Sequence, residues 1–263
     1  MTKIITIANQ KGGVGKTTTA LCLGAELQEK GFKVLYIDLD KQCNTSETLR
    51  ADTDKKGSYE ILTNKEDAKE LIQITQTGDA VICGSEMLDV VENILNSNKN
   101  SVGKEYRLKK SLESVKGLFD FIIIDTPPRL DSTTINALTT TDYLIIVSGA
   151  DTYSVKGIKD LYTTINNVRE YTNANLIVGG FLITRFNQRG NINQAYKEQL
   201  EKLASNFNTK VYKTFIRENI AIKESQALGQ HITTYAPKSN ANEDYLNFTN
   251  EVLEDLNNIE KGA

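Results

Sequence analysis

A glycine-rich segment that joins an apolar run to a helix-period stretch constrains the fold of this chain more than any other feature. The apolar, β-branched run at residues 4–8 leads into Lys11-Gly-Gly-Val-Gly-Lys16-Thr-Thr, and residues 17–30 have the spacing of a helix. The glycines let the backbone wrap closely around an anion, with successive N–H groups directed at phosphate oxygens. The order of strand, glycine-rich turn and helix therefore predicts a phosphate-binding loop.

Each position of this loop has an expected contact. In the pattern G-x-x-x-x-G-K-[ST], the lysine reaches the β- and γ-phosphates and the hydroxyl binds Mg²⁺. Lys16 and Thr17 hold those positions here, while Gln10 replaces the first glycine of the pattern. The expected ligands are ATP or ADP with Mg²⁺. The expected nucleotide contacts in the loop are Lys11, Gly12, Gly13, Val14, Gly15, Lys16, Thr17 and Thr18.

Lys11 is a second cation in the same loop. It cannot easily fold back over the phosphates that Lys16 occupies, so one interpretation is that it projects towards a nucleotide held by a second copy of the chain. Such a contact would make dimerisation depend on nucleotide, because the charged groups stabilise each other only in the assembly. The other interpretation is an ordinary solvated lysine, and spacing alone does not separate the two.

A pair of carboxylates ends the second apolar run. The run at residues 34–37 is followed by Asp38-Leu-Asp40, whose alternation places both aspartates on the same side of a strand next to the phosphate loop. Carboxylates at this place hold Mg²⁺ waters or orient the attacking water. A purely structural alternative is that they cap the following turn.

A third carboxylate ends the apolar run at residues 121–124. Asp125 completes a Walker-B pattern, in which four apolar residues carry a carboxylate to the magnesium. Thr126-Pro127-Pro128 follows at once, and two consecutive prolines restrict this segment near the γ-phosphate to few conformations.

Apolar runs alternate with helix-period stretches along the rest of the chain. Runs that are apolar on both faces are typical of strands buried in a parallel sheet. We expect an α/β fold, a doubly wound, mostly parallel sheet that binds ligands beyond the carboxyl ends of its strands. The expected strands are residues 4–8, 34–37, 80–82, 121–124, 143–147 and 176–183, and the expected helices are residues 17–30, 133–140, 154–170, 193–204 and 242–259.

The chain shows no composition break. Residues 1–263 are therefore expected to form a single P-loop ATPase domain, with residues 51–78 as a polar, helical or irregular excursion over the surface. The net charge of −3 names no partner, but residues 184–238 carry nine Lys/Arg against four Asp/Glu, and the tail from Ser239 carries six Asp/Glu against one Lys. This asymmetry fits a basic face that touches polyphosphate, or simply an uneven solvated surface.

The cysteines and the apolar segments bear on location. Three cysteines without metal-ligand spacing predict neither a disulfide framework nor a zinc site, which fits a reducing compartment. The sequence has no signal-peptide pattern and no apolar run of about 18 residues. The expected location is the cytoplasm, without membrane partners.

Together these motifs resemble the ParA/MinD division of P-loop ATPases, which has a deviant Walker-A loop. The resemblance is strongest to the short ParA-type partition ATPases that lack an N-terminal helix-turn-helix domain, and it covers essentially the whole chain. The residues that carry it are Lys11-Gly-Gly-Val-Gly-Lys16-Thr-Thr, Asp38-Leu-Asp40-Lys-Gln-Cys-Asn-Thr-Ser46, Ile124-Asp125-Thr-Pro-Pro128, Asn136-Ala-Leu138, Tyr153-Ser-Val-Lys-Gly157 and Pro237-Lys-Ser239.

The resemblance implies a cycle of assembly on DNA. ATP with Mg²⁺ drives a sandwich homodimer, the dimer binds DNA without sequence preference, and a ParB-type partner stimulates hydrolysis and release. The protein would then be nucleoid-associated and would segregate plasmid or chromosomal DNA.

The resemblance also implies roles for individual residues. Lys11, Lys16 and Asp40 are the implied catalytic residues, Lys11 by reaching the partner's phosphates and Asp40 by activating the water. Asp38 joins Thr17 and Asp125 around the magnesium. The implied adenine contacts are Thr184, Arg185 and Pro237.

Two departures from the family pattern affect these expectations. Members usually read Asp-Pro-Gln-Gly where this chain has Asp40-Lys41-Gln42-Cys43, so the loop could be set differently while the chemistry is kept. In the segment equivalent to the DNA-contacting helix, residues 216–224, Ala221 replaces a common arginine. Non-specific DNA binding needs only several cations on one face. The candidates for contacts with DNA phosphates are Arg189, Lys213, Arg217 and Lys223, with Lys197 and Lys202 as further cations.

Other functions were possible on the same motifs. A MinD-like membrane ATPase would need a basic amphipathic C-terminal helix, whereas the last helix here is acidic. Three enzyme classes are further alternatives. An iron–sulfur enzyme would need thiolates at a dimer axis. A capsule-regulating kinase would have a tyrosine-rich tail, and a carboxylate-activating ligase shares the fold. A ParA-like ATPase that positions a protein cargo would share every motif and stays open. His231, the sole histidine, has no neighbouring nucleophile or base in the sequence, so we expect no catalytic role for it.

Overall fold

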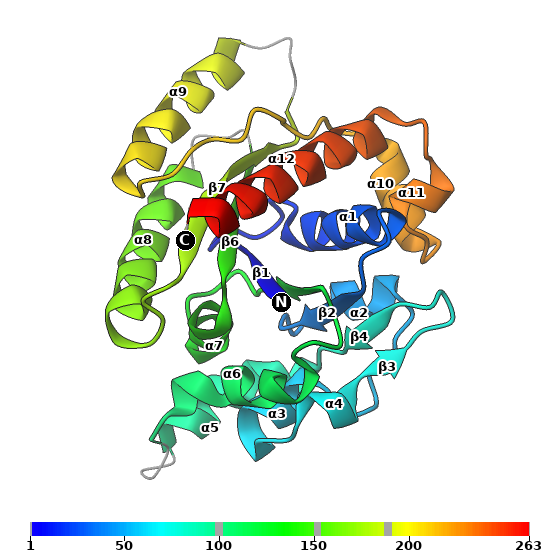
Figure 1. The fold of residues 1–263 in the computed structure, drawn as a ribbon, viewed down its shortest axis with the longest axis vertical. Coiled ribbons are helices and arrows are strands. Elements are labelled where there is room, and N and C mark those ends of the chain that lie inside the picture. Colours follow the sequence, from blue (N-terminus) through cyan, green and yellow to red (C-terminus); the bar gives the residue numbers. More distant parts are fainter. Residues whose placement is uncertain (1, 98–101, 150–153, 187–190, 263) are drawn as a thin grey trace.

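A seven-stranded sheet forms the centre of the protein (Figure 1). The computed structural model describes residues 2–97, 102–149, 154–186 and 191–262. The strand order within them is β3 (Gln73–Ile74), β4 (Ala80–Ile82), β2 (Val34–Asp38), β5 (Phe121–Asp125), β1 (Lys3–Ala8), β6 (Tyr143–Gly149) and β7 (Ile177–Thr184). All neighbouring pairs are parallel except β3 and β4. The doubly wound, mostly parallel α/β class is confirmed.

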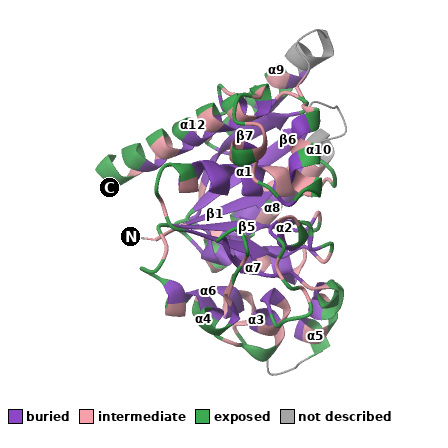
Figure 2. Ribbon diagram, turned by 90° about the vertical axis from the view of Figure 1, so that its right-hand side faces the viewer, coloured by how far each residue is buried: buried purple, intermediate pink, exposed green. Residues whose placement is uncertain are grey.

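The central strands are predominantly apolar because they are buried on both faces, whereas the edge strand β3 is partly exposed. In β5, Phe121 and Ile123 join a core cluster on one face, and Ile122 and Ile124 join another cluster on the opposite face. Figure 2 shows the central strands as buried. This double burial explains why no polar alternation marks these segments in the sequence.

Helices cover both faces of the sheet (Figure 1). One face packs against α1 (Lys16–Glu29), α10 (Ile220–Ala227), α11 (Ile232–Tyr235) and α12 (Asn240–Gly262), with α2 (Asn44–Thr48) at its edge. The other face packs against α3 (Ser58–Asn64), α4 (Ala68–Leu71), α5 (Val91–Ser97), α6 (Arg107–Leu112), α7 (Ser132–Thr140), α8 (Ser154–Tyr171) and α9 (Asn191–Asn206). Short 3₁₀ turns lie at η1 (Glu86–Val90), η2 (Lys104–Tyr106) and η3 (Glu113–Val115).

The polar stretch at residues 51–78 is more ordered than its composition indicated. It contains α3 and α4, whose Ile61, Leu62, Ala68 and Leu71 are buried in the core, and it ends in the short strand β3. β3 pairs antiparallel with β4 and so forms one edge of the sheet. The interpretation as a surface excursion therefore holds only for the loops between these elements.

The acidic tail does not stay apart from the basic segment that precedes it. α12 packs beside α1, and Asp255 on it accepts hydrogen bonds from Lys210 and from the hydroxyl of Tyr143. Glu251 accepts the backbone N–H groups of Lys213 and Thr214. The charge asymmetry seen in the sequence is thus partly cancelled inside the fold. None of the helices in the described ranges is long and apolar enough to cross a membrane.

Glu26 in α1 is a buried carboxylic acid whose Oε1 has no hydrogen-bond partner among the described residues. Burial raises the pKa of Glu26 to about 7, against the attraction of Lys30. Folding therefore favours its protonated form. Stability is lost as the pH rises from about 4.3, the pKa of glutamate in an unfolded chain, towards the folded value, and it stays lost above that value.

We predict that Glu26→Gln removes this loss. At pH 8 the variant should be more stable than the parent by about 1–2 kcal/mol, and the difference should vanish near pH 4. Urea unfolding followed by circular dichroism at several pH values measures it. Glu29→Gln, at an exposed position of the same helix, is the control. An equal stability difference at both pH values would contradict the prediction.

Candidate functional site

The phosphate loop folds as an open cradle at the carboxyl end of β1. Gly13 and Gly15 have φ angles of 71° and 90°, in the left-handed region that favours glycine. Gly15 precedes α1, and no side chain caps this helix start and no acidic residue lies in its first turn. The first N–H groups of α1 therefore have no competing side-chain acceptor, which leaves the positive end of the helix available to an anion.

Two polar side chains hold the cradle in place. Asn9 donates to the carbonyl of Val147 at 2.6 Å, and its side-chain oxygen accepts the N–H of Lys11 at 2.9 Å. Thr184, at the end of β7, donates to the carbonyl of Val14 at 2.7 Å. The loop is thus fixed to β6 and β7 before any ligand arrives, which reduces the ordering that binding requires.

Lys16 lies inside the loop and is buried. Its ammonium is 3.3 Å from the carbonyl oxygen of Lys11. Burial lowers the pKa of Lys16, while the carboxylates of Asp125 and Asp40 act in the opposite direction. A buried ammonium with an incomplete set of partners is suited to bind a phosphate oxygen.

Asp38 and Asp125 face each other across adjacent strands. They are register partners at the ends of β2 and β5, and both are buried. Burial, and for Asp38 the neighbouring charge of Asp125, raises the pKa values of both carboxyls. Oδ2 of Asp125 accepts the hydroxyls of Thr17 at 2.7 Å and Thr45 at 2.9 Å, whereas its buried Oδ1 has no partner among the described residues. This oxygen can accept a cation-bound water.

The other two carboxylates of the site have different surroundings. The Asp38 carboxylate accepts the backbone N–H and the hydroxyl of Ser46, at 2.9 and 2.7 Å, and the N–H of Asp40 at 3.1 Å. It therefore fixes the start of α2 and the loop before it. Asp40 accepts the N–H of Gln42 and lines a cavity above the phosphate loop. Asp40 is thus the carboxylate of this loop that lines the cavity.

The residues that replace the family's proline and glycine, Lys41 and Cys43, have defined positions in this loop. Cys43 takes a φ of 52°, so it adopts the left-handed conformation that glycine would favour. Lys41 forms an ion pair with Asp89 at 2.7 Å, and Arg129 pairs with the same carboxylate at 3.1 Å. The thiol of Cys43 is buried, as are those of Cys22 and Cys83.

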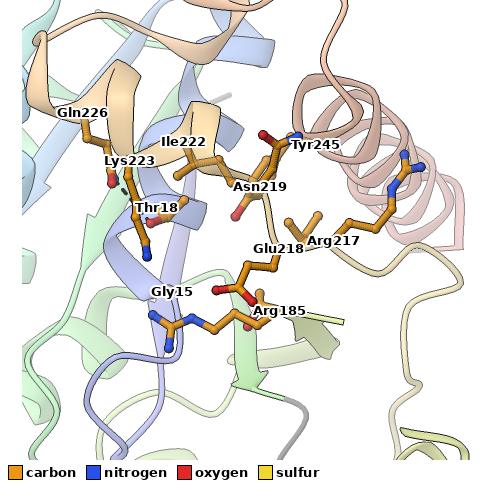
Figure 3. A pocket seen from close by; sticks show the side chains of 12 residues that line it. Gly15, Thr18, Arg185, Arg217, Glu218, Asn219, Ile222, Lys223, Gln226 and Tyr245 are labelled. Atoms are coloured by element: carbon orange, nitrogen blue, oxygen red, sulfur yellow. Dashed lines mark hydrogen bonds between the residues drawn. The ribbon is translucent and has the colours of Figure 1, made fainter. Parts of the chain in front are cut away.

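Two adjoining cavities extend from the phosphate loop. One has a volume of about 440 Å³ and is lined by loop residues together with Asp40, Gln42 and Pro128. The other has a volume of about 140 Å³ and lies between Gly15 and Thr18 on one side and α10 on the other (Figure 3). Arg185 and Gln226 line both. The larger cavity lies over the phosphate loop, and the smaller one is partly apolar.

Most of the predicted nucleotide residues come together here, but not all of them. Thr184 and Arg185 line the smaller cavity, and Arg185 has an unusual φ of 52°. Pro237 is exposed and lines neither cavity, because the turn before α12 carries it away. The sequence reasoning missed Ile216, Asn219, Ile222, Gln226 and Tyr245, which wall the smaller cavity. From the sequence, residues 216–224 are interpreted only as a segment for contacts with DNA.

The four candidate DNA contacts fall into different environments. Arg217 is bound to both carboxylate oxygens of Asp244 and to Glu243, so its charge is already neutralised. Lys223 lines the smaller cavity, where its side chain lies beside Thr18 (Figure 3). Lys213 is exposed. Arg189 lies outside the described residues.

Comparisons with known proteins agree with this geometry. A family model described as an AAA domain matches residues 2–178. The sporulation initiation inhibitor protein Soj of Bacillus subtilis is 37% identical and covers 96% of this chain and 98% of its own length. The chromosome partitioning protein ParA of Myxococcus xanthus is 32% identical, over 95% of this chain and 88% of its own.

A solved structure with a similar fold contains a bound nucleotide. The structure of cobyrinic acid a,c-diamide synthase from Mycobacterium smegmatis with bound ADP and magnesium has a TM-score of 0.83 and 29% sequence identity, and the match covers 98% of this chain and 96% of the other.

We predict that Lys16→Ala weakens nucleotide binding by about 10- to 100-fold, because a charge-assisted contact to phosphate is lost in a buried position. Titration with a fluorescent ATP analogue measures the affinity. Lys30→Ala, at the exposed end of α1, is the matched control and should bind like the parent. A Lys16→Ala variant with parental affinity would show that the loop does not hold the phosphates.

Proposed function

Because this chain belongs to the ParA-type P-loop ATPases, the family of the Soj and ParA proteins, we propose that it hydrolyses ATP in a cycle that segregates DNA. The observation that carries the proposal is the convergence of a preformed phosphate loop with Lys16 and Asp40 on one cavity, while Asp125 accepts the hydroxyl of Thr17 from the same loop. A buried cation and strand-end carboxylates around a phosphate cradle are what phosphoryl transfer requires.

The residues around Asp125 fit a magnesium ion. Its unpartnered buried Oδ1 and the hydroxyl of Thr17 supply the hard oxygen donors that Mg²⁺ prefers. When bound, the ion would neutralise charge on the β- and γ-phosphates. Asp38 keeps the loop in place through Ser46 and would belong to the outer shell of this site. We propose ATP and ADP with Mg²⁺ as the ligands of this chain.

Asp40 is the residue we propose to orient the attacking water. It is one of three strand-end carboxylates near the phosphate loop, and it borders the cavity next to Gln42 and Pro128. Its carboxylate accepts the N–H of Gln42 at 3.1 Å, which holds it beside the cavity. Hydrolysis would run on water positioning and electrostatics rather than on a covalent intermediate.

We propose that ATP joins two copies of the chain across this cavity. Lys11 lies at the entrance of the loop, and its backbone is held by Asn9 and Lys16. With the backbone fixed in this way, the side chain would extend towards the nucleotide of the partner and stabilise the assembly only while phosphates are present.

The dimer would bind DNA without sequence preference. Exposed lysines of the basic segment support this, and Lys213 is the clearest of the four candidates. Arg217 is left out of the proposed DNA surface because Asp244 and Glu243 already neutralise it. A ParB-type partner would stimulate hydrolysis and so release the dimer, with the protein on the nucleoid in the cytoplasm.

The alternative of a protein cargo uses the same cycle and differs only in the partner. The similarity to a chromosome partitioning protein at 32% identity over 95% of this chain supports DNA as the cargo. The identity to the cobyrinic acid a,c-diamide synthase is lower, at 29%. No described contact favours a second function.

We predict that Asp40→Ala still binds ATP but hydrolyses it at least about 100-fold more slowly, because the water loses its orienting base. Phosphate release measures hydrolysis, and size-exclusion chromatography with ATP and Mg²⁺ should show an accumulated dimer. Asp54→Ala, an exposed carboxylate outside the phosphate cavity, is the control. Parental hydrolysis by Asp40→Ala would remove Asp40 from the proposed mechanism.

The experiment that tests the function as a whole is co-sedimentation with random-sequence duplex DNA at low salt. The arms are no nucleotide, ADP and ATP, each with Mg²⁺, for the parent and for Asp40→Ala. We expect binding only with ATP, and we expect it to weaken steeply as salt rises, because phosphate contacts release counterions. ATP-dependent dimerisation without DNA binding in any arm would refute DNA segregation.

A further inference from the structure

α10 forms a wall of the nucleotide site and also part of the outer surface. Its Ile222, Lys223 and Gln226 line the smaller cavity, opposite Gly15 and Thr18 of the phosphate loop and α1 (Figure 3). At the two ends of the helix, Ile220 and Leu228 are 65% and 50% exposed. A movement of this helix would therefore change the site and the surface together.

A hydrogen bond ties the inner face of α10 to α1. The side-chain amide of Gln226 donates to the hydroxyl of Thr18 at 3.3 Å, as the dashed line in Figure 3 shows. Thr18 lies in the first turn of α1, next to the N–H groups expected to meet phosphate. A ligand in the loop would compete for this hydroxyl or reorient it.

A second hydrogen bond ties the C-terminal end of α10 to α2. The guanidinium of Arg50 donates to the carbonyl of Leu228 at 2.8 Å, where a cation also complements the negative end of the helix. Arg50 packs against Gly229 so closely that a Cβ at position 229 would lie 2.4 Å from its Nε. A side chain at position 229 would therefore displace the guanidinium of Arg50.

The backbone at Arg50 is itself unusual. Arg50 follows α2 with a φ of 56°, in the place where glycine is common after a helix. The N–H groups of Arg50 and Ala51 close the end of α2 on the carbonyls of Glu47 and Ser46. This geometry directs the Arg50 side chain away from its own helix and towards α10.

The other end of α2 is bonded to the buried carboxylates. Thr45 donates to Asp125, and Ser46 donates to Asp38. Hydrogen bonds thus connect one end of α2 to the residues expected to surround the metal and its other end to the C-terminal end of α10. Two sets of hydrogen bonds therefore connect the nucleotide site to α10. One runs through α2 and Arg50 to Leu228, and the other runs from Thr18 to Gln226.

We propose that Arg50 and Gln226 are positioning residues that make the placement of α10 depend on the nucleotide in the loop. This proposal rests on the proposed ATP binding and adds how that binding would affect the surface. Arg50 would pass a displacement of α2 to α10, and Gln226 would pass a displacement of Thr18 to α10. The exposed ends of α10 then differ between the empty and the loaded protein. His231, at the start of the following helix α11, is paired with Asp79 at 2.9 Å.

The test is backbone hydrogen exchange of residues 220–228, measured by mass spectrometry on the full chain without nucleotide, with ADP and with ATP, each with Mg²⁺. The ADP arm separates filling of the cavity from formation of a dimer. In the parent we expect nucleotide to slow this exchange by about fivefold or more, in the range of ordinary coupling between sites.

The decisive variant is Arg50→Gly. Glycine suits a φ of 56°, so the change deletes the guanidinium without disturbing the end of α2. We expect it to speed the exchange of α10 without nucleotide and to reduce the nucleotide effect to less than about twofold. The matched control is Lys65→Gly, another exposed cation at positive φ after a helix, with a φ of 62°.

Each outcome decides one of the two proposals. If Arg50→Gly keeps the parental exchange in every arm, or if the parent's α10 ignores a nucleotide that it demonstrably binds, the coupling through Arg50 is wrong. If the parent binds no ATP, the proposed function fails. In that case the arm without nucleotide still decides whether Arg50 restrains α10.

Discussion

The opposition of Asp38 and Asp125 at the ends of two adjacent strands is the constraint on which the rest of the site depends. Two buried carboxylates in register repel each other, and they are tolerated only if donors or cations compensate them. Ser46, Thr45 and Thr17 supply the donors, and Lys16 supplies a nearby charge. The start of α2 and the end of the phosphate loop are therefore placed by the needs of one charged pair.

Several cations of this chain pair with carboxylates or carbonyls of the fold, and several border the two cavities. Arg217 and Lys210 neutralise carboxylates of α12, and Arg107 donates to carbonyls at the end of α3. Lys16, Arg185 and Lys223 border the two cavities, and Arg217 also lines the smaller one although its charge is paired. Net charge over a stretch of sequence does not distinguish these classes, because the pairing depends on residues far away along the chain.

Much of the fold was readable because its signals are local. The phosphate loop, the parallel strands and the long helices each carry a pattern within about 15 residues. The wall made by α10 was not readable, since Gln226 and Tyr245 reach the cavity only through tertiary packing. The neutralisation of Arg217 depends on Asp244, 27 positions later. Pro237 lies in the turn before α12 and lines neither cavity, so its predicted adenine contact stays a prediction.

Because the three thiols are buried, we expect the native protein to react slowly with alkylating reagents. Burial raises the pKa of Cys43 to about 12 and that of Cys83 to about 11, and only the thiolate reacts. The rate of alkylation would therefore measure how often the structure opens locally. Alkylation of Cys43 would report opening of the loop after Asp40, and alkylation of Cys22 would report opening of α1. A single cysteine introduced on the surface could then carry a dye with almost no background labelling.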